Sequence, residues 1–119
     1  MITLPWPPTV NTLHTVSKGR KILSARGRAW YEEAGWLLAR AASSLVRGRV
    51  EIAIKLYPPT RRRYDIDNRI KPVLDLLTKH QIIEDDDITV VRRLTVTGHD
   101  YSQDEPARAE VEVRPYEIL

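Results

Sequence analysis

The segment from Val50 to Tyr57 constrains the fold most, because its side chains alternate in polarity and two prolines follow it. The apolar positions of the alternation are Val50, Ile52, Ile54 and Leu56. Successive side chains of a strand point to opposite faces, so a period of two predicts a half-buried strand. Pro58 and Pro59 end this strand, since proline cannot donate to a sheet ladder.

A first helix is predicted from about Ala25 to Leu45, where apolar residues recur with a period of 3.6 residues. Ser24 stands before it in the N-cap position. Trp30 and Trp36 lie within this segment, and we interpret them as core or interface residues rather than as platforms for stacking bases.

A second helix is predicted from about Asn68 to Lys79, with its apolar residues on one face and Asp67 as a candidate cap. Pro72 qualifies this prediction, because a proline inside a helix removes a backbone hydrogen bond. Either the first turn starts nearer Arg69 or it is distorted.

Three further strands are expected, and the segment between the first strand and the first helix, Thr9 to Leu23, is expected to be a loop. The strands are a short one at Ile2 to Leu4 and two alternating runs at Val90 to Val96 and Ala107 to Val113. The order β-α-β-α-β-β predicts an α/β (α+β) fold, a mixed four-stranded sheet with two helices packed on it. Its 119 residues suit one domain, so we expect a single domain over residues 1–119.

Composition excludes several classes of protein. The chain has no cysteine, so it has neither disulfides nor a thiolate zinc site. No run approaches the roughly 20 apolar residues of a membrane-spanning helix, and the first residues do not resemble a signal peptide. We therefore expect a cytoplasmic protein without a membrane partner.

The charged residues are segregated, although 19 Lys and Arg against 16 Asp and Glu leave a formal net charge of only +3. Arg61, Arg62 and Arg63 stand directly before Asp65 and Asp67. The acidic run Glu84-Asp85-Asp86-Asp87 follows some twenty residues later. Basic side chains could hold a polyanion while the acids hold cations that the phosphates also touch.

The acids predict a site for a hard cation. If the chain is extended from Asp65 to Asp67, both carboxylates point the same way and can share one ion. Asp86 can return to them, since a helix of about 12 residues rises roughly 18 Å and the linker after it can span at most about 24 Å. Such ligands suit Mg²⁺, with Mn²⁺ as a substitute, and these ions promote phosphodiester hydrolysis. Lys71 lies one turn beyond Asp67 and could neutralise transition-state charge or orient the water.

Simpler interpretations stay open for each motif. Asp67 could be only a helix cap, Asp85 to Asp87 a solvated turn, and Arg61 to Arg63 a charged loop. The run Lys18-Gly19-Arg20-Lys21 has the composition of a phosphate-contacting loop and also of an ordinary solvated one. A calcium loop is rejected, because Ile70 replaces the required glycine and Leu76 the required glutamate. His14, His80 and His99 show no ligand spacing and are expected to be surface or structural residues.

Taken together, the motifs resemble those of RusA-like Holliday junction resolvases. The resemblance covers most of the chain and is carried, in the same order, by Ile2-Thr3-Leu4-Pro5-Trp6-Pro7-Pro8 with Asn11, by Asp65-x-Asp67-Asn68-x-x-Lys71 and by Ile83-Glu84-Asp85-Asp86. It implies a homodimer that binds four-way DNA junctions and, with magnesium, makes paired nicks in opposing strands in DNA recombination and repair.

The resemblance also implies roles for single residues. Asp65, Asp67 and Asp86 would be the metal-binding carboxylates and Lys71 the catalytic lysine, although Asp85 or Asp87 could replace or assist Asp86. A junction cut symmetrically needs two equivalent sites, which favours a two-fold dimer, and the first helix is a candidate for its surface. The residues expected to contact DNA are Asn11, Lys18, Arg20, Lys21, Arg61, Arg62, Arg63, Asn68 and Arg69.

Two other hypotheses compete with a junction resolvase. A non-catalytic nucleic-acid-binding module would bind in a salt-sensitive manner and never cut. A nuclease of different specificity would use the same site on forks or flaps.

Overall fold

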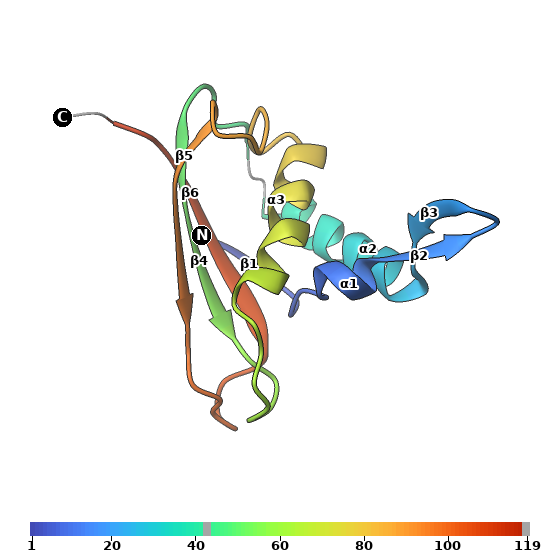
Figure 1. Ribbon diagram of the computed structural model, residues 1–119. Helices are drawn as coiled ribbons and strands as arrows, with labels where there is room; N and C mark the ends of the chain where they lie inside the picture. The colour runs from blue at the N-terminus through green and yellow to red at the C-terminus, as the bar shows by residue number, and fades with distance from the viewer. Residues whose placement is uncertain (42–43, 118–119) are drawn as a thin grey trace.

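The computed structural model describes residues 1–41 and 44–117 as a layer of helices packed on one face of a mixed sheet, with a separate hairpin projecting from one end (Figure 1). The strands of the sheet are β1 (Ile2–Leu4), β4 (Val50–Tyr57), β5 (Val91–Gly98) and β6 (Arg108–Pro115). The helices are α1 (Val10–Leu13), α2 (Ala25–Arg40) and α3 (Ile70–Lys79), with a 3₁₀ turn η1 (Asp67–Arg69) directly before α3. The hairpin consists of β2 (His14–Ser17) and β3 (Arg20–Leu23).

The four-stranded sheet has the order β1-β6-β4-β5. Only β4 and β5 run parallel, with α3 in the connection between them, whereas β6 pairs antiparallel with β1 and with β4. A parallel pair needs such a crossover, because a tight turn cannot return the chain to the same end of the sheet. The predicted mixed four-stranded sheet with two main helices is confirmed.

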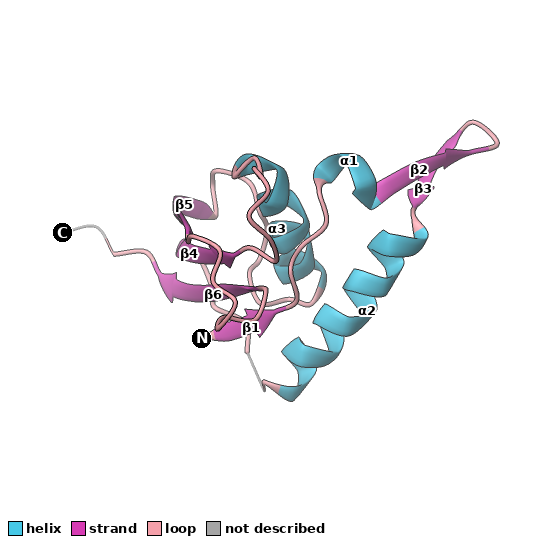
Figure 2. Cartoon of the chain, turned by 90° about the horizontal axis from the view of Figure 1, so that it is seen from below, coloured by secondary structure: helices cyan, strands magenta, loops and turns pink. Residues whose placement is uncertain are grey.

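The core lies between the sheet and the two longer helices, which cover the same face (Figure 2). The alternation of β4 places its apolar residues on that face, where all of them are buried. The principal partners across the interface are Trp30, Ala34 and Leu38 of α2 and Val73, Leu76 and Leu77 of α3. On the uncovered face, side chains such as Glu51 and Arg93 pair with each other in solvent.

Helix α2 begins as predicted, because the Ser24 hydroxyl accepts a hydrogen bond of 2.9 Å from the Gly27 N–H. The predicted end at Leu45 is wrong. The helix ends at Arg40, and Val46 instead forms a parallel bridge with Ile83. The sequence hides this end because no proline or glycine stands between Arg40 and Gly48. Residues 42–43 of the predicted helix lie outside the described residues.

The two tryptophans of α2 have different surroundings. Trp30 is buried in the core, and its indole N–H donates to the Pro5 carbonyl at 3.0 Å. Trp36 is 70% exposed. Trp30 confirms the expectation as a core residue, whereas Trp36 lies outside the core and its place in an interface stays a prediction.

Pro72 is the third residue of α3 and is buried. The first backbone N–H groups of a helix have no partner within it, so proline removes no helical bond there. Asp67 is not the cap of this helix, because Arg69 occupies the N-cap position and the 3₁₀ turn makes no side-chain cap hydrogen bond.

The expectation of a loop from Thr9 to Leu23 is wrong, since α1 and the β2–β3 hairpin occupy it. Thr9 and Thr12 form a capping box at the start of α1. Lys18 and Gly19 both have positive φ, 53° and 76°, as the tightest two-residue hairpin turns require. Gly27 permits α2 to approach the end of α1, because a Cβ there would collide with the Leu13 carbonyl.

Candidate nuclease site

The candidate site begins after β4, which ends at Tyr57, in the connection that leads to η1. Asp65 lies in this connection, is exposed, and accepts a hydrogen bond of 3.3 Å from the Asn68 amide. Asp67 is the first residue of η1 and is also exposed. Ile66 between them has helical φ and ψ of −64° and −36°. The extended segment from which a common direction of the two carboxylates was predicted is therefore not formed.

Lys71 connects the two acidic parts of the chain. Its ammonium lies 3.3 Å from a carboxylate oxygen of Asp86 and 3.0 Å from one of Asp75, its neighbour one turn along α3. The Lys71 side chain is 56% exposed and that of Asp86 24%. The chain therefore returns after α3 to the first turn of that helix, where Asp86 meets Lys71.

Each of the three consecutive acids has a different contact. The Asp85 carboxylate accepts the Asp86 N–H at 2.7 Å. The Asp87 carboxylate accepts the Thr89 N–H at 2.8 Å and also the Thr89 hydroxyl. Asp85 and Asp87 therefore hold the turn, whereas Asp86 is the acid of this turn that contacts Lys71.

The contact shifts the pKa values of both partners. The Lys71 ammonium donates hydrogen bonds to Asp75 and to Asp86. These bonds, that to Asp75 first, raise the pKa of Lys71 against the opposing effect of its slight burial. Partial burial raises the pKa of Asp86, but the hydrogen bond and charge of Lys71 outweigh it and leave that pKa below its ordinary value. Both groups are therefore charged at neutral pH.

The carboxylates fit a hard cation in their chemistry, since Asp65, Asp67 and Asp86 offer oxygen ligands that solvent reaches. Within residues 1–41 and 44–117, however, no three Asp, Glu or His side chains are gathered into one metal-binding group. Asp86 instead shares the Lys71 ammonium with Asp75.

A pocket of about 630 Å³ opens beside Asp65. We call it the aromatic pocket; its walls include Trp6, Arg61, Tyr64, Asp65, His99 and Tyr101. Arg61, Arg62 and Arg63 are all exposed, and the first two line this pocket. Asp67, Lys71 and Asp86 do not line it, so Asp65 is the candidate metal ligand that the two parts of the site share.

Arg69 is half-buried, and its guanidinium is fixed by one hydrogen bond and two aromatic rings. Its guanidinium donates to the Pro7 carbonyl at 2.6 Å and lies 5.1 Å and 5.2 Å from the ring centroids of Trp6 and Tyr64. Burial lowers the pKa of Arg69, and its Nε finds no hydrogen-bond partner within the described part of the chain. Arg69 thus ties the proline-rich start of the chain to the candidate site.

The other predicted DNA contacts lie on two further surfaces. Asn11 is exposed on α1, which packs against η1 and therefore adjoins the acidic segment. Lys18, Arg20 and Lys21 are exposed on the hairpin, away from the sheet (Figures 1 and 2).

Sequence patterns did not indicate Asp75, Trp6, His99 or Tyr101 as site residues. Asp75 carried a signal that could have found it, because residues four apart on a helix are neighbours and Lys71 precedes it by four. The pocket residues carried none, since they come from distant parts of the chain.

Comparison with known proteins places this chain beside one family. A family described as endodeoxyribonuclease RusA matches residues 5–114. The crossover junction endodeoxyribonuclease RusA of Escherichia coli K12 is 38% identical over 79 residues, which are 66% of this chain and 66% of that protein. The protein of the same name from Escherichia coli O139:H28 is 35% identical over 94 residues, 78% of each chain, and that of Enterobacteria phage 82 is 37% identical over 79 residues, 66% of each.

Among the described residues, no helix is long and apolar enough to cross a membrane. The resemblance inferred from the motifs is confirmed by the match over residues 5–114. The chain belongs to the endodeoxyribonuclease RusA family.

Proposed function

We propose that this protein is a magnesium-dependent, structure-selective endodeoxyribonuclease that resolves four-way (Holliday) junctions by paired symmetric nicks in DNA recombination and repair. The observation that carries the proposal is the contact between Lys71 and Asp86, which joins the Asp65–Lys71 segment to the acidic turn. In a member of this family, whose relatives are named crossover junction endodeoxyribonucleases, that contact supports a nuclease site.

Asp65, Asp67 and Asp86 would hold the metal ion, Mg²⁺ or Mn²⁺ in its place. A bound ion of this type lowers the pKa of water, polarises the phosphate and stabilises the leaving oxygen. Lys71 holds Asp86 in place and keeps a positive charge where negative charge develops on the phosphate.

The cationic surfaces would hold the DNA arms. Arg61, Arg62 and Arg63 stand beside Asp65, and the hairpin carries Lys18, Arg20 and Lys21 some distance from it. With Asn11, Asn68 and Arg69 these make the set of proposed DNA contacts. Of that set, Arg69 supports binding by fixing Trp6 and Tyr64.

Two equivalent sites are needed to cut a two-fold junction symmetrically, so we propose that the protein acts as a homodimer whose protomers each contribute one domain spanning residues 1–119. The exposed Trp36 of α2 is a candidate for the surface that pairs. Sedimentation of the protein with and without Trp36→Ala would test that surface.

The decisive experiment incubates the protein with a synthetic four-way junction, a fork, a flap and a linear duplex, each with magnesium or with chelator. Paired, magnesium-dependent nicks in the junction alone are expected. Equal cutting of forks or flaps would identify a nuclease of different specificity. Tight, salt-sensitive binding without any nick would identify a binding module.

A further inference from the structure

The aromatic pocket is larger than the carboxylate site requires. Its volume of about 630 Å³ is in the range that proteins use to enclose small organic ligands, roughly 300–1,000 Å³. The pocket and the carboxylate site meet at Asp65. A group that enters the pocket would therefore lie next to the phosphate that the carboxylate site acts on.

One wall of the pocket is a tyrosine ring with a cation above it. The Arg61 guanidinium lies 5.6 Å from the ring centroid of Tyr101, within the distance of a cation–π contact. Tyr101 is half-buried, so its position is set by the protein. This wall offers a flat ring and a planar cation.

A second wall is the His99 imidazole, which ends a three-layered stack. His99 lies on the Tyr57 ring with 4.3 Å between centroids and 7° between planes. Arg108 lies 3.8 Å from the same Tyr57 centroid, and two groups this close to one ring must occupy opposite faces of it. Because His99 is exposed while Tyr57 covers one face of its ring, the other face is open.

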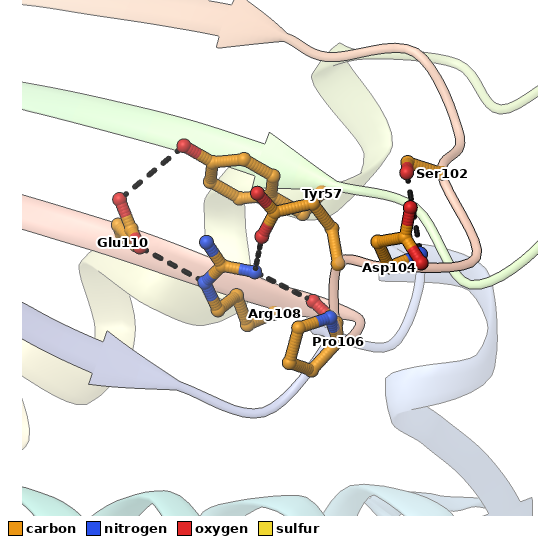
Figure 3. Close-up of polar contacts among 7 residues, drawn as sticks. Tyr57, Ser102, Asp104, Pro106, Arg108 and Glu110 are labelled. Atoms are coloured by element: carbon orange, nitrogen blue, oxygen red, sulfur yellow. Dashed lines mark hydrogen bonds and ion pairs between the residues drawn. The ribbon is translucent and has the colours of Figure 1, made fainter.

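His99 rests as a platform on a braced stack, and Figure 3 shows the polar contacts of the two layers beneath it, Tyr57 and Arg108. Arg108 donates to Glu110 at 2.9 Å and to the Pro106 carbonyl at 2.8 Å, and it pairs with Glu105 at 2.9 Å. The backbone N–H of His99 donates a hydrogen bond to the backbone carbonyl of Leu56 at 2.9 Å. The platform therefore exists before any ligand binds.

We propose that the aromatic pocket receives an unpaired nucleobase that has left the helical stack at the branch point, next to the strand to be cut. Flat rings bind bases through their π-faces, and guanidinium groups add cation–π attraction. Asp65 and Asp100 also line the pocket, and carboxylates accept hydrogen bonds from exocyclic amines of bases. The proposal rests on the proposed function, since it assigns part of the same substrate to a neighbouring subsite.

A base in this pocket would explain selectivity for junctions, because freeing a base costs less free energy at a branch point than in a duplex. In an intact duplex, a base must be unpaired and unstacked before it can enter, which costs free energy. At a branch point, that cost is lower, because stacking is already interrupted. The pocket would therefore favour branched DNA over an intact duplex.

The test places an abasic site, one position at a time, around the branch point of a four-way junction. Affinity is measured with chelator present, so that no cutting occurs, for the wild-type protein, Tyr101→Leu and Tyr101→Phe. With the intact junction, Tyr101→Leu is expected to bind about tenfold more weakly, an effect within the range for one base–ring stack, and Tyr101→Phe to bind as the wild type does. With the abasic site at the responsible position, the difference between wild type and Tyr101→Leu should vanish.

Tyr116→Leu is the matched control, because Tyr116 forms a similar pair with Arg93, 5.5 Å from ring centroid to guanidinium, and does not line the pocket. It should bind every junction as the wild type does. Tyr101→Leu could instead lose affinity, relative to the wild type, by the same factor on every abasic junction as on the intact one. Tyr101 would then contact the DNA backbone and not a base, and the proposal would be overturned. Equal losses of junction affinity in Tyr101→Leu and Tyr116→Leu would also overturn the proposal.

A parallel cutting assay with magnesium separates this proposal from the proposed function. The wild-type protein could make paired nicks in the junction while the abasic series shows no dependence of affinity on Tyr101. That result would reject the base pocket and leave the proposed function standing. A wild-type protein that neither binds nor cuts the junction would reject both.

Discussion

The carboxylate site and the aromatic pocket meet at Asp65, yet different forces hold them. Asp65, Asp67 and Lys71 are exposed, and single polar contacts such as Lys71 with Asp86 define their positions. The pocket contains half-buried aromatic rings as well as exposed groups, and Arg69 is fixed there between a backbone carbonyl and two rings.

The difference has a functional meaning. Exposed carboxylates can rearrange around a cation and a phosphate at little cost, because few contacts must break. A packed pocket keeps its shape before DNA arrives, so it loses little entropy on binding. Four changes to the chain would test this division, beginning with the largest expected effect.

Asp65→Asn should abolish cutting of the junction while junction binding is retained, because the amide keeps the shape of the side chain and removes its charge. Cleavage with magnesium and affinity with chelator measure the two effects. Asp104→Asn is the control, since Asp104 is an exposed acid in the β5–β6 connection. Cutting at the wild-type rate by Asp65→Asn would remove this residue from the mechanism.

Arg69→Met should lower the free energy of unfolding by about 2 kcal/mol, because it deletes a hydrogen bond from a charged group and two cation–π contacts. Urea unfolding measures the change. Arg63→Met, at an exposed arginine in the same segment, should stay within about 0.5 kcal/mol of the wild type. Similar stability of the two variants would show that the pocket is not held through Arg69.

Asp75→Asn should lower the rate of cutting about tenfold, as is typical when a partner that orients a site residue is lost. Asp75 is a positioning residue, since it acts through Lys71, which it contacts at 3.0 Å. Single-turnover cutting should slow while the affinity for the junction stays unchanged. A change in affinity without a change in rate would contradict this role.

Loss of the Tyr31 phenol proton in alkali should lower the stability of the protein. We expect this to be the smallest of the four effects. Burial first, and the charge of Asp75 second, raise the pKa of the Tyr31 phenol from 10.0 to about 12. The unfolded chain therefore releases this proton at lower pH than the folded one, so the stabilising contribution is complete below pH 10 and is lost as pH rises toward 12.

Urea unfolding across this range would measure the loss. Tyr31→Phe should weaken the dependence on pH, whereas Tyr116→Phe should leave it unchanged. Asp75→Asn should move the Tyr31 pKa back toward its ordinary value. An unaltered dependence in Tyr31→Phe would assign the alkaline loss of stability to other groups.

Much of the architecture could be predicted from local patterns. The alternation in Val50–Tyr57 and the cap at Ser24 led to β4 and to the start of α2. The end of α2 and the β2–β3 hairpin could not be predicted. The bridge between Val46 and Ile83 depends on a distant partner, and the hairpin is short and mostly exposed, so it carries little hydrophobic periodicity.

The site followed the same division. The spacing of Asp65, Asp67 and Lys71 and the family resemblance were readable from the sequence. Asp86 was favoured as the third acid, with Asp85 or Asp87 as residues that could replace or assist it. The structure shows Asp86 as the one in contact with Lys71, because the carboxylates of its two neighbours bond to the turn itself. The extended segment on which the common direction of Asp65 and Asp67 depended is not formed, because Ile66 is helical.

By itself, the sequence determined the strands of the sheet, its two main helices, the acids and cations that the chain carries, and its family. Each of these depends on residue types at short spacing. The tertiary structure decided that β6 lies between β1 and β4, that Lys71 meets Asp86, and that Trp6, His99 and Tyr101 line one pocket. These features join residues far apart in the chain. They depend on which surfaces bury one another, and no local pattern contains that information.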